Sequence, residues 1–208
     1  RTATLSEGES LRFLHEHGVP AAQFVSVDRA GLLAAADSLG YPLVLKQDVA
    51  ETHISDSGGV VLDIRNAAEL EQAADAMLAR AASPLLVSQF RPGLELIASV
   101  FVHADFGPLL MTGSGGIWTE ALADVRFVPL PAARAAIERA LGQTLAGRIL
   151  REGKRGASGF EAAVGLLESL AGCFVACLAD IAQIELNPVT VRNGQALAVD
   201  ASVTRIDR

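Results

Sequence analysis

Apolar residues recur along this chain with two different periods, and these periods divide the sequence into helices and strands. Apolar positions three and four residues apart predict helices over 5–17, 29–39, 66–82 and 160–179, and one or two helices over 131–150. Short apolar runs bounded by turn residues predict strands over 24–27, 43–45, 60–64, 85–87, 94–102, 109–112 and 127–128. Residues 47–59 are polar, contain glycine and lack a period, which predicts a loop. This mixture of elements is typical of an α+β protein.

The order of the elements predicts two lobes. Helices and strands alternate over residues 1–83, as in an α/β lobe. Several strands follow one another at the start of 84–208 before the helices resume, which indicates a largely antiparallel sheet covered by helices. Ser83-Pro84 separates the two sets of elements, so we expect the lobe boundary there.

The last strands, over 181–203, form a predicted hairpin around Asn193-Gly194, because both residues tolerate the positive φ of a two-residue type I′ turn. Counting outward from the turn, Asn187 pairs with Asp200, and Glu185 lies on the same face. Two carboxylates and a carboxamide are hard-oxygen ligands of the kind that bind Mg²⁺. Pro188 has no N–H to donate, which predicts an edge or an interruption of the sheet. The alternative is a surface hairpin with a solvated polar face.

Composition and charge restrict the classes of partner. The chain is half hydrophobic, has a formal net charge of −7 and contains no basic run, so we expect neither nucleic acid nor an anionic membrane as a partner. No apolar stretch is long enough to span a bilayer. Cys173 and Cys177 lie four residues apart in an apolar helical segment, which favours buried thiols over a redox or metal pair. Thiols of this kind favour a reducing, cytoplasmic location.

Two features are suited to binding phosphate. Lys46 follows a buried strand and precedes a loop that contains glycine, where its ammonium group can reach a phosphate. The alternative is a lysine that extends to solvent from the end of a strand. Gly113, Gly115 and Gly116 allow backbone amides to approach an anion closely, although a glycine-rich turn is a weak signal alone.

His53 stands in the polar loop that follows Lys46, and Asp56 comes three residues later. A histidine in this setting can act as a nucleophile or a proton carrier. The alternative is an ordinary loop histidine. No Gly-x-Ser-x-Gly motif supports hydrolase chemistry, and no Cys/His spacing indicates zinc.

Four segments together resemble a known family. They are YPLVLK (41–46), HISDSGGVVL (53–62), ELIASVFVHADFGPLLMTGSGGIWTEALADVRFVPL (95–130) and IELNPV with AVDA (within 184–201). Their sequences and order are similar to those of the ATP-grasp domain of NDP-forming acyl-CoA synthetases. This domain corresponds to the β subunit of ADP-forming acetyl-CoA synthetase and is related to the succinyl-CoA synthetase β chain. The resemblance covers nearly the whole chain and implies an ATP-grasp fold, in which two α/β lobes enclose the nucleotide.

The resemblance also implies roles for individual residues in nucleotide binding. Lys46 matches the lysine that contacts the phosphates of ATP. Gln89 falls at the hinge beside the adenine, and Glu95 matches a glutamate that contacts the nucleotide. Gly115 and Gly116 belong to the glycine segment on the nucleotide side.

Further roles concern the metal ion and the phosphoryl group. Asn187 and Asp200 match the ligands of Mg²⁺, and Glu185 supports that site. His53 matches the histidine that carries a phosphoryl group in the ADP-forming enzymes, and Asp56 follows it as in the family motif. The implied reaction is acyl-CoA + ADP + phosphate ⇌ carboxylic acid + CoA + ATP.

The implied partners are the CoA-binding and ligase domains of the same enzyme, on a longer chain or on an α subunit, within a homo- or hetero-oligomer. Two other functions remain open. Residues VAET before His53, and Ile54 after it, depart from the family pattern, which favours a degenerate module that senses nucleotide without catalysis. A more distant alternative is an ATP-grasp carboxylate–amine ligase without a histidine relay.

Overall fold

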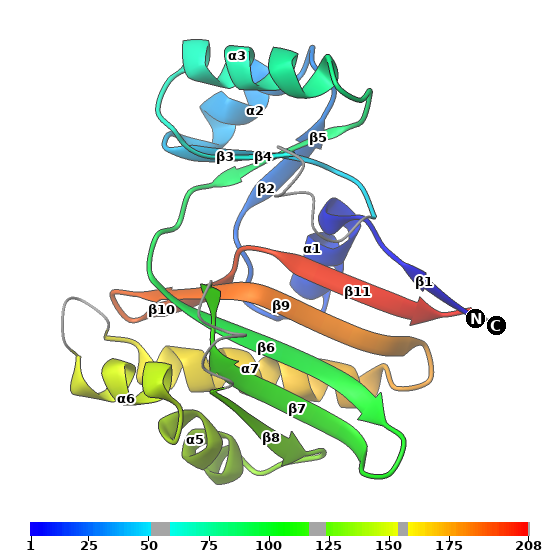
Figure 1. Cartoon of the computed structure of the whole chain (residues 1–208), viewed down its shortest axis with the longest axis vertical. Coiled ribbons are helices and arrows are strands. Elements are labelled where there is room, and N and C mark those ends of the chain that lie inside the picture. Colours follow the sequence, from blue (N-terminus) through cyan, green and yellow to red (C-terminus); the bar gives the residue numbers. More distant parts are fainter. Residues whose placement is uncertain (51–58, 117–123, 154–157, 208) are drawn as a thin grey trace. The chain divides into compact units, whose positions relative to one another are not determined.

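The computed structural model describes residues 1–50, 59–116, 124–153 and 158–207 and divides the chain into two compact units (Figure 1). The smaller unit comprises Leu5–Arg12 and Ala22–Arg91, and the larger unit comprises Arg1–Thr4, Phe13–Ala21 and Pro92–Arg208. Each unit contains its own sheet. No helix in the described ranges combines the length and the apolarity needed to cross a membrane.

The smaller unit has a four-stranded antiparallel sheet in the order β2-β5-β3-β4. Its strands are β2 (Phe24–Val27), β3 (Leu43–Gln47), β4 (Val60–Ile64) and β5 (Leu85–Gln89). Helices α2 (Leu32–Leu39) and α3 (Ala67–Leu78) pack on one face. Leu43 and Leu45 join the core beneath these helices, so the alternation of β3 directs Lys46 to the opposite face.

Local hydrogen bonds explain where the helices of this unit begin. Helix α1 (Glu7–Glu16) starts at a capping box, in which the Glu9 amide donates to Ser6 Oγ and the Ser6 amide donates to the Glu9 carboxylate. Helix α3 is capped by Asn66, whose Oδ1 accepts a hydrogen bond from the Glu69 amide. Helix α2 begins later than predicted, after a turn in which the Gly31 amide donates to Asp28 Oδ1.

The larger unit has a seven-stranded sheet with the path β1-β11-β9-β6-β7-β8, and β10 pairs with β9 beside this path. Its strands are β1 (Thr2–Thr4), β6 (Leu94–His103), β7 (Gly107–Ser114), β8 (Val125–Pro129), β9 (Ile181–Arg192), β10 (Gln195–Ala198) and β11 (Ala201–Ile206). The sequence did not predict β1. All three residues of this strand are exposed, and it pairs at the sheet edge with β11, about two hundred residues away, so no local hydrophobic pattern marks it.

One face of this sheet forms the core of the unit. Pairing across five strands aligns a row of aliphatic residues, each at most 5% exposed: Val203, Ile184, Val100, Leu110 and Val128. Helices α5 (Arg134–Gly142), α6 (Leu145–Glu152) and α7 (Phe160–Ala176) cover this face (Figure 1). The neighbouring row, which points to the opposite face, contains Ser202, Glu185, Ser99, Met111 and Phe127.

The division between the units differs from the predicted boundary at Ser83-Pro84. The structure divides the chain between Arg91 and Pro92. The reason is strand β5, which pairs with both β2 and β3 in the interior of the four-stranded sheet. The sequence of a short apolar strand does not indicate which sheet the strand joins. The sequence alone therefore assigned β5 to the wrong lobe.

Candidate functional site

Lys46 lies near the end of β3, as predicted, but its side chain does not extend to solvent. Its ammonium nitrogen is 2.6 Å from Glu7 Oε1, and both side chains are only 7% exposed. The residues that pair with Lys46 on the adjacent strands, Val60 on β4 and Leu86 on β5, are apolar. A buried charge requires a counter-charge and hydrogen bonds. Glu7 therefore stabilises the ammonium group at this position.

A second contact fixes the first turn of α1 beside Lys46. The Gly8 amide donates to Asp48 Oδ1 at 2.9 Å, and Ser26 Oγ donates to Asp48 Oδ2 at 2.6 Å. A side chain at position 8 would collide with the Asp48 carboxylate. Glu7 and Gly8, two adjacent residues in the first turn of α1, thus both bond to residues at the end of β3.

Gln89 occupies the last position of β5. Its side-chain amide donates to the Leu39 carbonyl at 2.9 Å, and its side-chain oxygen accepts a hydrogen bond from Arg91. The residue is half-buried at the end of the smaller unit's sheet, beside the last residue of α2. Its predicted contact with adenine stays a prediction.

Glu95, Gly115 and Gly116 lie together in the larger unit. The Gly115 amide donates to the Glu95 carbonyl at 2.9 Å, and a Cβ atom on Gly115 would come within 2.7 Å of the Leu96 backbone. Gly116 has a φ of +75° and lies against the Glu95 carboxylate. The close backbone approach at Gly115 and the positive φ at Gly116 both favour glycine, which has no Cβ atom. The carboxylate and the glycine segment that were predicted to contact nucleotide are therefore neighbours.

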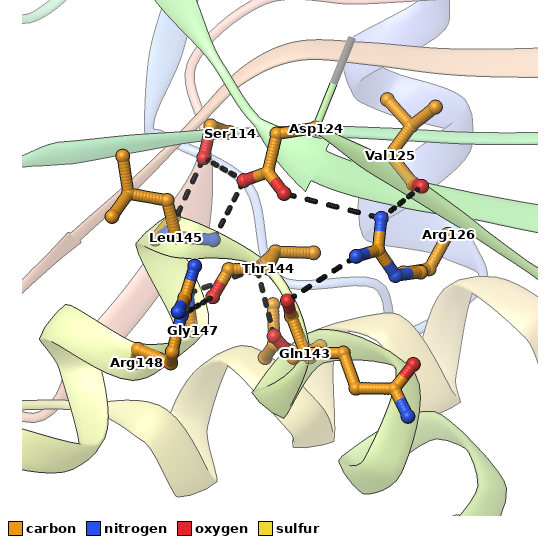
Figure 2. Close-up of polar contacts among 11 residues, drawn as sticks. Ser114, Asp124, Val125, Arg126, Gln143, Thr144, Leu145, Gly147 and Arg148 are labelled. Atoms are coloured by element: carbon orange, nitrogen blue, oxygen red, sulfur yellow. Dashed lines mark hydrogen bonds and ion pairs between the residues drawn. The ribbon is translucent and has the colours of Figure 1, made fainter. Parts of the chain in front are cut away.

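The glycine segment is attached to the N-terminus of α6 through Asp124, which Figure 2 shows between Ser114 and the first turn of that helix. Ser114 Oγ donates to Asp124 Oδ2 at 2.7 Å, and the Leu145 amide donates to the same oxygen at 2.6 Å. The Ala146 amide donates to Ser114 Oγ at 3.2 Å. The negative charge suits the positive end of the helix dipole. Ser114 stands between the glycines, so this network holds their backbone in place.

Arg126, a cation without an assigned role in the sequence, is part of the same network. Its Nη1 lies 4.0 Å from Asp124 Oδ1 and donates to the Val125 carbonyl at 2.8 Å (Figure 2). Its other terminal nitrogen lies 3.5 Å from the Gln143 carbonyl. Arg126 thus supports the connection between β8 and the turn before α6.

The C-terminal hairpin has the predicted register. Gln195 pairs with Arg192 and Ala196 with Val191, on either side of the Asn193-Gly194 turn. The same count continues through β11, where Ala201 pairs with Leu186. Asn187 and Asp200 are level with each other by this count, in the gap between the two paired stretches.

Both strands lose their regular pairing at this gap. Beside β6, strand β9 has one extra residue around Asn187 and Pro188, because Leu96 pairs with Val189 while Ala98 pairs with Leu186. Because β9 lies between β11 and β6, Pro188 marks an interruption of the sheet and not an edge. A bulge of this kind redirects side chains, and here it coincides with the two predicted metal ligands.

The residues around the gap are suited to a hard cation. Asn187 is exposed, and Glu185 and Asp200 are half-buried. Glu185 pairs with Ser99, whose buried hydroxyl has no hydrogen-bond partner among the residues that the structure describes. Within the described ranges, no three His, Cys, Asp or Glu side chains are grouped as a metal site requires, so a site here depends on the Asn187 amide oxygen. The oxygen-only donor set fits Mg²⁺.

The remaining predicted catalytic residues, His53 and Asp56, lie outside the described residues. The cysteines are described, and neither forms a disulfide. Cys173 is buried in α7, where burial and the neighbouring Cys177 thiol raise its pKa to about 12. The prediction of buried thiols is therefore confirmed for Cys173, whereas Cys177 is only half-buried.

Three residues of this arrangement were not identified from the sequence: Glu7, Ser114 and Asp124. Glu7 lies within the helix predicted over 5–17 but was given no role, and its partner is 39 residues away. Ser114 ends β7 and Asp124, ten residues later, directly precedes β8. The available signals were an acidic residue in the first turn of α1 and a serine between glycines, and both patterns are too common to indicate a site.

Comparisons with known proteins identify a family over nearly the whole chain. A family model described as an ATP-grasp domain matches residues 1–204. The β subunit of acetate–CoA ligase [ADP-forming] I from Pyrococcus furiosus is 30% identical over 95% of this chain and 90% of its own length. Acetate–CoA ligase [ADP-forming] II from Archaeoglobus fulgidus is also 30% identical over 96% of this chain, which spans only 30% of that relative's length.

Solved structures give the same result for the fold. Two structures of the dinucleotide-forming acetyl-coenzyme A synthetase 1 of Ca. Korarchaeum cryptofilum align with TM-scores of 0.89 and 0.84, at 27% and 29% identity. In each case the match covers 98% of this chain and at least 93% of the other. One structure contains coenzyme A and Ca-AMPCP. The other contains coenzyme A and Mg-AMPPCP and has a phosphohistidine segment that points towards the nucleotide-binding site.

Proposed function

This chain belongs to the ATP-grasp domain family, and from that membership we propose that it is the nucleotide-binding, phosphoryl-relay domain or subunit of an ADP-forming acyl-CoA synthetase. The observation that carries the proposal is the match to both curated relatives and solved structures along nearly the full chain. The positions of Lys46 and of the Asn187–Asp200 gap support it.

The proposed reaction in this chain is the last part of a longer sequence. Partner domains convert acyl-CoA and phosphate into acyl phosphate and CoA. The phosphoryl group then passes from the acyl phosphate to a histidine of those domains, which releases the carboxylic acid, and from that histidine to His53. His53 then carries it as a phosphohistidine. The bond between the imidazole nitrogen and phosphorus breaks while a terminal β-phosphate oxygen of ADP forms a new bond to phosphorus, which gives ATP and a neutral imidazole.

The other residues of the chain would position the nucleotide and neutralise charge. Lys46 would pair with the phosphates as a point charge, and the amides around Gly115 and Gly116 would approach the nucleotide closely. Asn187 and Asp200, with Glu185 beside them, would hold Mg²⁺. The metal ion would screen the negative charge that accumulates on the phosphate oxygens during transfer. Gln89 would contact the adenine.

The partners in this proposal are CoA-binding and ligase domains, located in the same longer chain or in a separate subunit. The β subunit of the Pyrococcus furiosus enzyme, which this chain spans almost completely, supports the second arrangement. We place the enzyme in the cytoplasm, in keeping with two cysteines that form no disulfide.

A reconstitution experiment tests the proposed function. The chain is mixed with its CoA-binding partner, Mg²⁺, acetyl-CoA, ADP and phosphate, and ATP formation is measured. We expect ATP formation by the wild-type chain and its loss in Lys46→Met. Lys154→Met is the matched control, because it removes the other lysine of the sequence by the same substitution. Equal rates for Lys46→Met and the wild type would contradict the proposed role of Lys46.

A further inference from the structure

The ion pair between Glu7 and Lys46 joins two parts of the sequence that neither motif analysis nor the family resemblance connects. The carboxylate comes from the first turn of α1 and the ammonium from the end of β3, with 2.6 Å between Glu7 Oε1 and Lys46 Nζ. Both side chains are 7% exposed. A pair this short and this buried is a charge-assisted hydrogen bond in surroundings of low polarity.

The setting of Glu7 keeps its carboxylate ionised and oriented. Glu7 is the first residue of α1, where backbone amides and the helix dipole favour a negative charge. The hydrogen bond from the Gly8 amide to Asp48 fixes the same turn against β3. Asp48 itself is held by Ser26, so the whole turn is attached to the sheet at defined positions.

The ion pair with Glu7 also favours the charged form of the Lys46 side chain. A lysine amine that is removed from water without a counter-charge favours its neutral form. Neutral lysine cannot serve as a point charge for phosphate. An ammonium group has three donors, so a bond to Glu7 is compatible with a bond to a phosphate oxygen.

We propose that Glu7 is a positioning residue for nucleotide binding, because it keeps the ammonium group of Lys46 charged and directed towards the phosphates. This inference rests on the proposed function in one respect, namely that Lys46 contacts the phosphates. Glu7 itself does not touch the nucleotide. Its effect on affinity passes through Lys46.

Two measurements on the chain test this role. The first is the affinity for ATP in the presence of Mg²⁺, by calorimetry. The second is trace acylation with acetic anhydride at pH 8, read by mass spectrometry, which reports the share of neutral amine. The sequence contains only two lysines, so Lys154 serves as the internal reference for Lys46. A purely structural role for Glu7 would not change the relative reactivity of a folded protein.

Three variants separate the charge of Glu7 from its shape. Glu7→Gln keeps the shape and removes the charge, and Glu7→Asp keeps the charge. Glu9→Gln is the matched control, because Glu9 lies in the same first turn, is exposed, and contacts Ser6 instead of Lys46. We expect Glu7→Gln to raise the acylation of Lys46 relative to Lys154 several-fold and to weaken ATP binding at least tenfold. Glu7→Asp should recover part of both, and Glu9→Gln should match the wild type.

The proposal is overturned if Glu7→Gln changes neither quantity, or changes one without the other. If Glu7→Gln does not fold, Glu7→Asp decides alone. The aspartate side chain is one methylene shorter, so its carboxylate lies farther from Lys46. The proposal therefore requires that, compared with the wild type, acylation of Lys46 is raised and ATP binding is weaker. Unchanged values would overturn it. Lys46→Met tests the proposed function separately: if this variant binds ATP as the wild type does, the contact between Lys46 and phosphate fails whatever the result at Glu7.

Discussion

Lys46 illustrates how single residues acquire their properties from distant parts of the chain. The apolar run before it predicted its position at the end of a strand, and the structure confirms that position. Its burial and its partner were not predictable, because Glu7 reaches it through a tertiary contact between the first turn of α1 and the end of β3. The same reasoning applies to Asp124, whose carboxylate joins a glycine segment to the start of a helix 21 residues later. Tertiary contacts of this kind leave no local pattern.

Replacement of Asp200 tests the predicted metal site. Asp200→Asn removes one negative ligand while keeping the size of the side chain, so we expect Mg²⁺-dependent ATP binding to weaken by about tenfold or more. Titration calorimetry at several Mg²⁺ concentrations measures the effect. Asp105→Asn, an exposed residue in the turn between β6 and β7, is the control and should have no effect. The same dependence on Mg²⁺ in Asp200→Asn and in the wild type would rule out Asp200 as a ligand.

The raised pKa of Cys173 gives a prediction about reactivity. With a pKa of about 12, only about one Cys173 thiol in ten thousand is the reactive thiolate at pH 8. We expect iodoacetamide to modify Cys173 very slowly in the native protein, and faster as the pH rises. In urea the thiol regains its ordinary pKa and should react readily. Peptide mass spectrometry distinguishes the two states, and equal rates in both would show that Cys173 is accessible and ionised in the fold.

At the scale of elements, the most reliable predictions came from the strongest local signals. The Asn193-Gly194 turn fixed the register of β9 and β10, and from it the alignment of Asn187 with Asp200. The long apolar stripe predicted α7. Pro188 predicted an edge or an interruption of the sheet, and the bulge in β9 beside β6 confirms the interruption. The exposed strand β1 depends on tertiary pairing and was not predicted. The alignment of the predicted ligands thus follows from the sequence, whereas the strand that interrupts its pairing there is identified only by the fold.

Gly172 within α7 and Gly159 just before it are expected to respond oppositely to replacement by alanine. Gly172 is exposed, and a Cβ atom there meets no other atom within 4 Å, so Gly172→Ala should stabilise the protein by about 0.5–1 kcal/mol. Gly159 precedes the helix with a φ of +146°, and a Cβ atom there would lie 2.6 Å from Val191 Cγ1. Gly159→Ala should destabilise by about 1–3 kcal/mol. Urea unfolding measures both, and two shifts of the same sign would contradict this description of α7.

At the scale of the whole molecule, the two units each carry a part of the predicted site. The smaller unit contains Lys46 and Gln89, and the larger unit contains Glu95, the glycine segment and the Asn187–Asp200 gap. The sequence predicted two lobes but placed their boundary before β5, because sheet membership is a property of the assembled fold. The order of the motifs identified the family, and the match over residues 1–204 confirms it.

The most direct test of the phosphoryl relay is the detection of phosphohistidine on this chain. The chain is incubated with its CoA-binding partner, Mg²⁺ and ATP radiolabelled at the γ-phosphate, and wild type is compared with His53→Ala. The relay predicts an acid-labile, base-stable label on the wild-type chain that is missing from the variant. Mg²⁺-dependent ATP binding without label on either chain would contradict the relay, and a module that only senses nucleotide would then be the better description.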